Sequence, residues 1–363
     1  MVLDDLGLAI RRMFNINFKK QPGESVLFIS DYVPVEYITE QNSRKCEMIN
    51  QRSNFVELLY MRSQDIFSES EVNLIKYPAT FQSGKEIPLN VIEMMKSHNI
   101  FVALTTYSLT HTDGILEACN NGARGASMPG FTPDMFEVSR PMASDHDKMR
   151  VLGEKYINEI IKAKEEDTER QCQVKIQDQS KNCLEFDILG NKRHFRHNFG
   201  LFHKPGMSGN LPAGDIHISP DIQENAFGRI SIPRVWTKFC HPESEFLTLI
   251  FDHGCVSAIE GAKDSLMEFL GFKEGNRSPA TEELKLSRRN LAEFGIGLNP
   301  FATKHDSLLE AQKILGTCYI GLGTSDTLGG VVKSDTHLNF VIPGANLFIN
   351  DKQIITNGVP IFK

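Results

Sequence analysis

Two stretches near the C-terminus dominate the sequence: Gly316-Thr317-Cys318-Tyr319-Ile320-Gly321-Leu322-Gly323, and then Ser334-Asp335-Thr336-His337-Leu338-Asn339. Both are short and mostly apolar or alternating, which predicts β-strands over residues 318–323 and 335–342. Successive side chains of a strand point to opposite faces, so Asp335, His337 and Asn339 are expected on one face. That face offers a carboxylate, an imidazole and an amide.

A third polar strand precedes them. In Asp215-Ile216-His217-Ile218-Ser219, the two isoleucines alternate with a carboxylate, an imidazole and a hydroxyl. These strands, together with Glu293, could build a site of mixed oxygen and nitrogen ligands, a set that suits Zn, Mn or Fe(II). The same residues could instead form a solvent-facing surface or hydrogen-bonded pairs.

Glu293 itself lies in an apolar, glycine-rich stretch and is expected to be at least partly buried. A buried carboxylate needs a partner. That partner could be a metal ion, a proton, or one of the two arginines just upstream, Arg288 and Arg289.

Composition excludes several classes of protein. The chain has 363 residues and a net charge of −7, so it is long enough for two domains and lacks the basic surface of a nucleic-acid groove. We find no apolar run near 18 residues, and therefore expect no membrane span. The seven cysteines show no zinc-site spacing and fit reduced thiols in a cytoplasmic protein.

The hydrophobic pattern changes along the chain. Residues 1–165 alternate strand-like segments, at 25–30, 54–60 and 100–105, with helical ones, which predicts an N-terminal α/β domain with an open, mostly parallel sheet. Residues 166–363 switch to period two, beginning with an expected hairpin of strands 173–177 and 184–188. This predicts a C-terminal α+β domain with antiparallel strands, which carries the candidate site.

Several of these segments, taken in order, resemble the thermophilic metallo-aminopeptidase family that includes aminopeptidase T and aminopeptidase S, often labelled leucyl aminopeptidases. The matching stretches are Thr106–Thr112, Gly122–Gly130, Gly209–Asp215, Leu291–Pro300, Gly316–Gly323 and His337–Asn339. The same fold is similar, more distantly, to 2,5-dihydroxypyridine 5,6-dioxygenase.

The resemblance implies a two-domain enzyme, an aminopeptidase-type hydrolase that is usually a homodimer. Members of the family use paired zinc or cobalt ions to activate a water molecule and to anchor the substrate amine, because two cations lower the pKa of the water and stabilise the tetrahedral intermediate. The dioxygenase instead uses one Fe(II), held by two histidines and one carboxylate.

Carried over residue by residue, the resemblance retains three metal ligands. Asp215 stands at a glutamate ligand position, and Glu293 and His337 match a glutamate and a histidine ligand. We expect catalytic roles to fall to Glu293 and to Tyr319.

Two other ligand positions are substituted. Tyr319 stands where the family has a ligand histidine, and Asn339 stands where it has the closing aspartate. Asp326 falls near the position of a family tyrosine. A neutral phenol is a poor zinc ligand at neutral pH, and the change from Asp to Asn removes a negative charge from a site that has to balance two dications.

Three states of the site follow. It could hold one ion through Asp215, Glu293 and His337; it could be rebuilt with replacement ligands; or it could bind no metal. The candidate replacement ligands are His217, Asp335, Asn339 and Asp326.

Three functions are possible: a divergent metal-dependent hydrolase of aminopeptidase type that acts on a peptide or amino-acid-like substrate, a non-catalytic protein that binds a peptide or small molecule, and a mononuclear Fe(II) oxygenase-like enzyme. We expect two partners, a small-molecule or peptide substrate and a second copy of the chain in a homodimer. We expect no nucleic acid and no membrane as partners.

Overall fold

The structure is a computed structural model that describes residues 3–110, 112–166, 172–188, 193–220, 225–274 and 280–362. The chain divides into two compact units. Unit 1 comprises Met1–His146 and Asn198–Ala213, and unit 2 comprises Asp147–His197 and Gly214–Lys363. The chain therefore returns to unit 1 for a short segment before it completes unit 2. Whether residues 1–165 form a domain on their own stays a prediction.

Unit 1 is built on a five-stranded parallel sheet, sheet A, in the order β2-β1-β3-β4-β8. Strands β1 and β3 are almost fully buried and mostly apolar, as expected for parallel strands that are covered on both faces. The strand bounds are β1 Val26–Tyr32, β2 Val72–Pro78, β3 Ile100–Leu104, β4 Arg124–Ser127 and β8 Ser208–Asn210.

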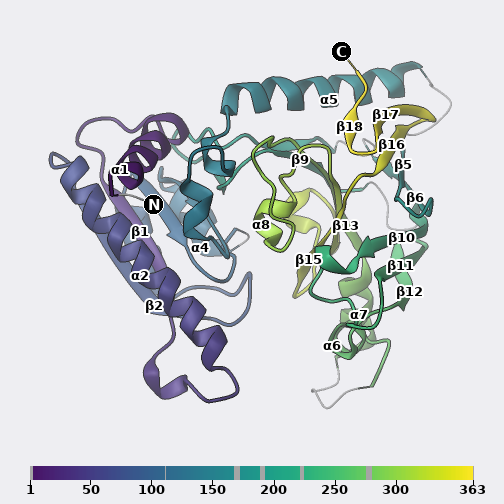
Figure 1. The fold of residues 1–363 in the computed structure, drawn as a ribbon, viewed down its shortest axis with the longest axis horizontal. Coiled ribbons are helices and arrows are strands. Elements are labelled where there is room, and N and C mark those ends of the chain that lie inside the picture. The colour runs from purple at the N-terminus through teal and green to yellow at the C-terminus, as the bar shows by residue number, and fades with distance from the viewer. Residues whose placement is uncertain are drawn as a thin grey trace. The chain divides into compact units, whose positions relative to one another are not determined.

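Three helices of unit 1 connect successive strands from β1 to β4: α2 Ser43–Ile66, α3 Leu89–Ser97 and α4 Asp113–Asn120. Helix α1, Leu3–Arg12, precedes β1. The long helix α2 runs along β1 and β2 (Figure 1).

The predicted strand at 54–60 is wrong, because these residues lie inside α2. The buried side chains of α2 recur at three- and four-residue steps, a helical stripe, and the short run 54–60 shows too little of it to be told from a strand. These buried residues are Cys46, Ile49, Ser53, Val56, Leu59 and Ser63. The strand that pairs with β1 at the sheet edge is β2.

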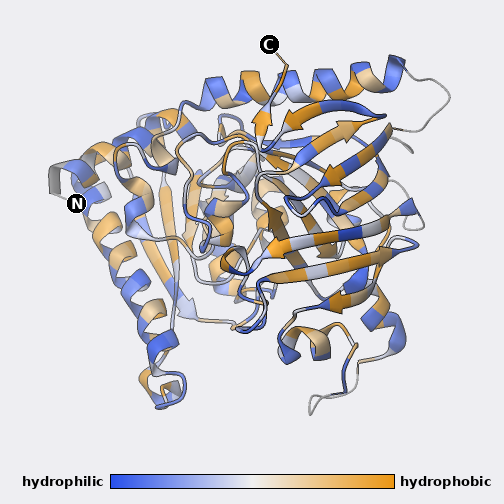
Figure 2. Cartoon of the chain, turned by 45° about the vertical axis from the view of Figure 1, so that its right-hand side comes forward, coloured by the Kyte–Doolittle hydropathy of each residue, from blue (hydrophilic) through white to orange (hydrophobic). Residues whose placement is uncertain are grey.

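Unit 2 contains an eight-stranded antiparallel sheet, sheet B, in the order β12-β11-β10-β6-β5-β16-β17-β18. The predicted hairpin at its centre is confirmed as β5 and β6, whose residues alternate between buried and half-buried. Figure 2, which colours residues by hydropathy, shows hydrophilic and hydrophobic segments in blue and orange along the strands of the chain. The bounds are β5 Cys172–Gln177, β6 Cys183–Ile188, β10 Phe227–Pro233, β11 Phe246–Asp252, β12 Cys255–Glu260, β16 Asn346–Ile349, β17 Lys352–Thr356 and β18 Val359–Pro360.

A second antiparallel sheet of unit 2, sheet C, carries the polar residues singled out from the sequence. Its strand order is β15-β14-β13-β9-β7. The bounds are β7 Arg196–Asn198, β9 Asp215–Ile218, β13 Leu291–Gly297, β14 Cys318–Gly323 and β15 His337–Ile342. A parallel sheet in unit 1 and antiparallel sheets in unit 2 together confirm the predicted mixed α/β fold class.

In the described part of unit 2 the α-helices are α5 His146–Glu166, whose first residue belongs to unit 1, α6 Asp264–Phe269, α7 Glu282–Arg289 and α8 Leu308–Ala311. Within the described ranges, no helix combines the length and the apolar character needed to cross a membrane.

Candidate functional site

The register of sheet C places the predicted site residues on one face. Gly295 of β13 lies opposite both His217 of β9 and Tyr319 of β14, and Glu293 lies opposite Gly321. Because alternate residues of a strand share a face, one face also carries Asp215, Asn339 and His337. The other face carries the apolar residues Ile216, Phe294, Ile320 and Phe340, all buried.

Two glycines make room for this arrangement. A Cβ atom at Gly295 would lie 2.2 Å from Cζ of Tyr319, so the tyrosine ring lies directly over this glycine. A Cβ atom at Gly321 would lie 2.6 Å from Oδ1 of Asn339 and 2.9 Å from Nε2 of His337. Gly295 and Gly321 therefore leave room for side chains of neighbouring strands to lie over the sheet.

Tyr319 connects the two buried carboxylates. Its hydroxyl lies 2.7 Å from Oδ2 of Asp215, to which it donates, and 3.3 Å from Oε1 of Glu293. Burial, together with the negative charges of Asp215 and Glu293, raises the pKa of Tyr319 well above its ordinary value, so the phenol keeps its proton. Tyr319 is thus a neutral hydrogen-bond donor to the two carboxylates.

Glu293 forms a second pair with His337. Nε2 of His337 lies 2.7 Å from Oε2 of Glu293, and its Nδ1 lies 3.2 Å from the carbonyl oxygen of Thr324. Burial would raise the pKa of Glu293, but the hydrogen bond from His337 and the nearby imidazole charges outweigh it and lower this pKa to about 2. Burial would lower the pKa of His337, but the same pairing raises it. The pair therefore favours a carboxylate beside a protonated imidazole.

Asp215 is paired with a lysine that the sequence analysis missed. Nζ of Lys313 lies 2.8 Å from Oδ1 of Asp215, and both residues are buried. Burial would raise the pKa of Asp215, but the charges of Lys313 and His217 hold it below its usual range. Lys313 follows the short helix α8 and precedes β14, and only the rule that a buried carboxylate needs a partner hinted at such a residue.

We call the cluster of these polar side chains on sheet C the centre; its residues are Asp215, His217, Glu293, Lys313, Tyr319 and His337. His217 lies at its more exposed edge. Its Nδ1 is 3.4 Å from Oδ2 of Asp215 and 3.9 Å from Oε1 of Glu293, both longer than a good hydrogen bond. The side chains of His217 and His337 are 17% and 15% exposed, whereas those of Asp215 and Glu293 are 3% and 7% exposed. The two imidazoles are therefore the groups that a ligand meets first.

Two of the suggested replacement ligands lie elsewhere. Asp335 precedes β15 and accepts two hydrogen bonds from the guanidinium of Arg288, at 2.8 and 2.6 Å. Asp326 accepts hydrogen bonds from Thr324 and Thr327 within its own turn. Arg288 thus pairs with Asp335 rather than with Glu293.

The residues present do not fit the pair of metal ions that the resemblance implies. The protonated hydroxyl of Tyr319 already donates between Asp215 and Glu293, where a shared cation would need their free lone pairs. The ammonium of Lys313 adds a positive charge against Asp215. Across the described part of the chain, no group of three or more His, Cys, Asp and Glu side chains has an arrangement that could hold a metal ion.

Comparisons with known proteins support the fold. No protein-family profile matches the chain, and no curated protein matches it by sequence. A solved structure of 2,5-dihydroxypyridine dioxygenase from Pseudomonas putida matches with a TM-score of 0.69 and 14% identity, over 100% of this chain and 99% of that one. Wild-type AmpT, aminopeptidase T, from Thermus thermophilus matches with a TM-score of 0.55 and 12% identity, over 99% of both chains. At these identities the likeness shows the fold alone: the chain has the two-unit fold shared by an aminopeptidase and a dioxygenase and is distantly similar to both.

Proposed function

We propose that this chain is a metal-independent binding protein for a small amino-acid-like or peptide-like molecule, built on a fold that it shares with an aminopeptidase. The observation that carries the proposal is the hydroxyl of Tyr319, 2.7 Å from Asp215 and 3.3 Å from Glu293. A proton on this phenol takes the place between the two carboxylates that a bridging cation would need.

The charges of the centre support this proposal. The carboxylate of Asp215 is balanced by Lys313, and that of Glu293 is balanced by His337. Buried charges that are paired and hydrogen-bonded in this way need no further cation for compensation. The charges of the two carboxylates are thus balanced by protein side chains, while Oδ1 of Asp215, beyond its ion pair, Nδ1 of His217 and Oδ1 of Asn339 have no hydrogen-bond partner among the described residues.

The accessible part of the network suggests how a ligand is held. His217 and His337 form its partly exposed edge, and Asp215 and Glu293 lie behind them. A ligand that carries both an amino and a carboxylate group matches this mixture of donors and acceptors. Binding there would orient the ligand without any group of the site activating water.

A second candidate function rests on a different observation. Two imidazoles flank one carboxylate, since Nε2 of His337 lies 2.7 Å and Nδ1 of His217 lies 3.9 Å from the oxygens of Glu293. Two histidines and one carboxylate are the ligand composition of mononuclear Fe(II) enzymes. This candidate requires His337 to exchange its hydrogen bond with Glu293 for a metal bond.

Elemental analysis and ligand titration of the full-length protein separate these functions. The protein is incubated with Zn, Co or Fe(II), dialysed and analysed for metal, and its thermal unfolding is followed with free amino acids and short peptides. We expect no retained metal, and we expect a rise in Tm with at least one ligand. His217→Gln should abolish the rise, while the matched change at the exposed His253 should leave it intact.

Other results of the same experiment overturn the proposal. One retained equivalent of iron would favour the mononuclear enzyme. Two equivalents of zinc or cobalt, together with hydrolysis of an aminoacyl substrate, would favour the aminopeptidase.

A further inference from the structure

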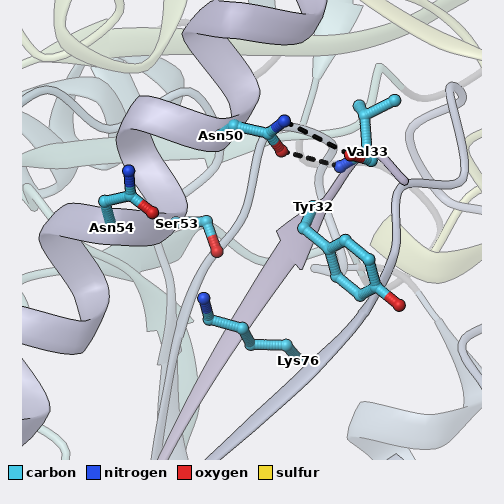
Figure 3. A pocket seen from close by; sticks show the side chains of 6 residues that line it. All are labelled: Tyr32, Val33, Asn50, Ser53, Asn54 and Lys76. Carbon is cyan, nitrogen blue, oxygen red and sulfur yellow. Dashed lines mark hydrogen bonds between the residues drawn. The ribbon is translucent and has the colours of Figure 1, made fainter. Parts of the chain in front are cut away.

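Unit 1 contains a cavity that the candidate site in unit 2 does not involve. Its volume is about 400 Å³, within the range of small-molecule sites. The lining residues come from the carboxyl end of β1, from β2 and from α2: Tyr32, Val33, Asn50, Ser53, Asn54 and Lys76 (Figure 3).

The cavity lies near the carboxyl ends of two strands of sheet A. Tyr32 is the last residue of β1, and Lys76 lies in the last half of β2. Ligands of open parallel sheets bind outside the carboxyl ends of the strands, where the strand order reverses. In sheet A that reversal falls between β1 and β3, whereas the cavity is lined by β1, β2 and α2. The lining residues, rather than the topology, therefore indicate a ligand.

Ser53 provides a second, independent observation. It is only 2% exposed, and its hydroxyl has no hydrogen-bond partner among the residues that the structure describes. It interrupts the otherwise mostly apolar stripe of α2, where a buried hydroxyl without a partner is unfavourable. In Figure 3 this hydroxyl and the ammonium of Lys76 point into the same space.

Asn50 holds the wall of the cavity in place. Its Oδ1 accepts a hydrogen bond from the Val33 amide at 2.9 Å, and its Nδ2 donates one to the Val33 carbonyl at 3.2 Å. This double contact fixes the end of β1 against α2. Two hydrogen bonds therefore hold the part of the wall that Val33 and Asn50 form.

The charges indicate the chemistry of the ligand. Lys76 is the one charged residue in the lining, and it pairs with Glu57 at the surface, whose side chain is 47% exposed. An ammonium group has three donors, so Lys76 can keep this pair and still donate to an anion in the cavity. The hydroxyl of Ser53 adds a neutral donor beside it.

We propose that this cavity of unit 1 is a binding site for a small organic anion, whose carboxylate or phosphate oxygens accept hydrogen bonds from Lys76 and Ser53. The two sources share the same oxyanion chemistry, and the ring of Tyr32 borders the remaining space. This inference does not rest on the function proposed for unit 2.

The test is a calorimetric titration of the full-length protein with two probes, inorganic phosphate and succinate. We expect saturable binding of at least one probe. Lys76→Met should weaken it about tenfold or more, since a hydrogen bond to a charged group is lost, and Ser53→Ala should weaken it severalfold.

Unit 1 offers matched controls for both changes. Lys96 is as exposed as Lys76, at 30% against 27% of the side chain, and it also pairs with a glutamate, so Lys96→Met should leave binding unchanged. Ser63 lies on the same stripe of α2, is buried, and likewise has no hydrogen-bond partner among the described residues. Both Ser53→Ala and Ser63→Ala should raise Tm, because each removes a buried hydroxyl without a partner. Only Ser53→Ala should weaken binding of the probe.

The probe that binds identifies the chemistry of the ligand. Binding of phosphate alone identifies a phosphorylated ligand, binding of succinate alone identifies a carboxylate, and binding of both supports the shared chemistry. The proposal is overturned if neither probe binds, or if Lys96→Met weakens binding as much as Lys76→Met does.

Discussion

The hydroxyl of Tyr319 donates a 2.7 Å hydrogen bond to Oδ2 of Asp215, which lies 104 positions earlier in the chain. The contact joins two strands of sheet C over a glycine, Gly295, and it brings a protonated phenol between two buried carboxylates.

Tyr319→Phe should destabilise unit 2. The change keeps the ring but leaves buried carboxylate oxygens without a donor, which costs about 1–3 kcal/mol. The free energy of unfolding from denaturant titrations measures this loss. Tyr156→Phe is the matched control, because Tyr156 is equally buried and its hydroxyl has no hydrogen-bond partner in the described part of the chain. Equal losses in the two variants would show that the Tyr319 hydroxyl contributes nothing.

Lys313→Met should be more harmful. It leaves the buried charge of Asp215 without its counter-ion, and breaking a buried pair in this way typically costs ~3–5 kcal/mol. Adding Asp215→Asn should restore part of the stability, because the uncompensated charge is then gone. Denaturant titrations of the two single variants and the double variant measure the coupling free energy between Lys313 and Asp215. Simple additivity of the two losses would contradict the pairing seen in the structure.

Stability should fall at both ends of the pH range because of the Glu293–His337 pair. The pKa of Glu293 is lowered to about 2, so its contribution is present above the unfolded value and is lost as the pH falls toward the folded one. The pKa of His337 is raised, so its contribution is full below the unfolded value and is lost as the pH rises through the folded one.

Thermal unfolding across the pH range tests this pair. Glu293→Gln should flatten the profile at both ends, since the Glu293–His337 interaction contributes to both pKa shifts. A profile that keeps its acid and alkaline slopes in this variant would assign them to other groups.

Gly295→Ala should disturb the centre through sterics alone. The added Cβ would meet the ring of Tyr319 at 2.2 Å, so the ring has to move away from Asp215. We expect a loss of about 1–3 kcal/mol, in the range for overpacked sites. Gly7→Ala serves as the control, because its Cβ would meet nothing closer than 3.9 Å and alanine favours the helix α1. A tolerated alanine at position 295 would mean that the ring has another place to lie.

Much of the fold could be predicted from hydrophobic periodicity. The alternation in 173–177 and 184–188 identified the hairpin β5–β6, and the short apolar runs identified β1 and β3. The exception is the segment 54–60, which predicts a strand when it is considered alone. The buried residues of α2 from Cys46 to Ser63 recur with helical spacing. A local window could not supply that longer period.

Only part of the candidate site could be predicted from the sequence. Alternation placed Asp215 with His217 and His337 with Asn339, and the structure brings both pairs to one face of sheet C. Lys313 could not be foreseen, because it lies outside the strands and its pairing with Asp215 depends on how the chain returns after α8. The roles of these residues as metal ligands or catalytic groups stay predictions.

Calorimetric titration of zinc into the wild-type protein and into a Tyr319→His, Asn339→Asp double variant tests the central claim most directly, namely that a tyrosine proton holds the place of a metal ion. We expect no stoichiometric binding to the wild type, and binding to the double variant, which regains an imidazole and a carboxylate at the two substituted positions. Stoichiometric zinc binding by the wild type that the two substitutions do not strengthen would contradict the account.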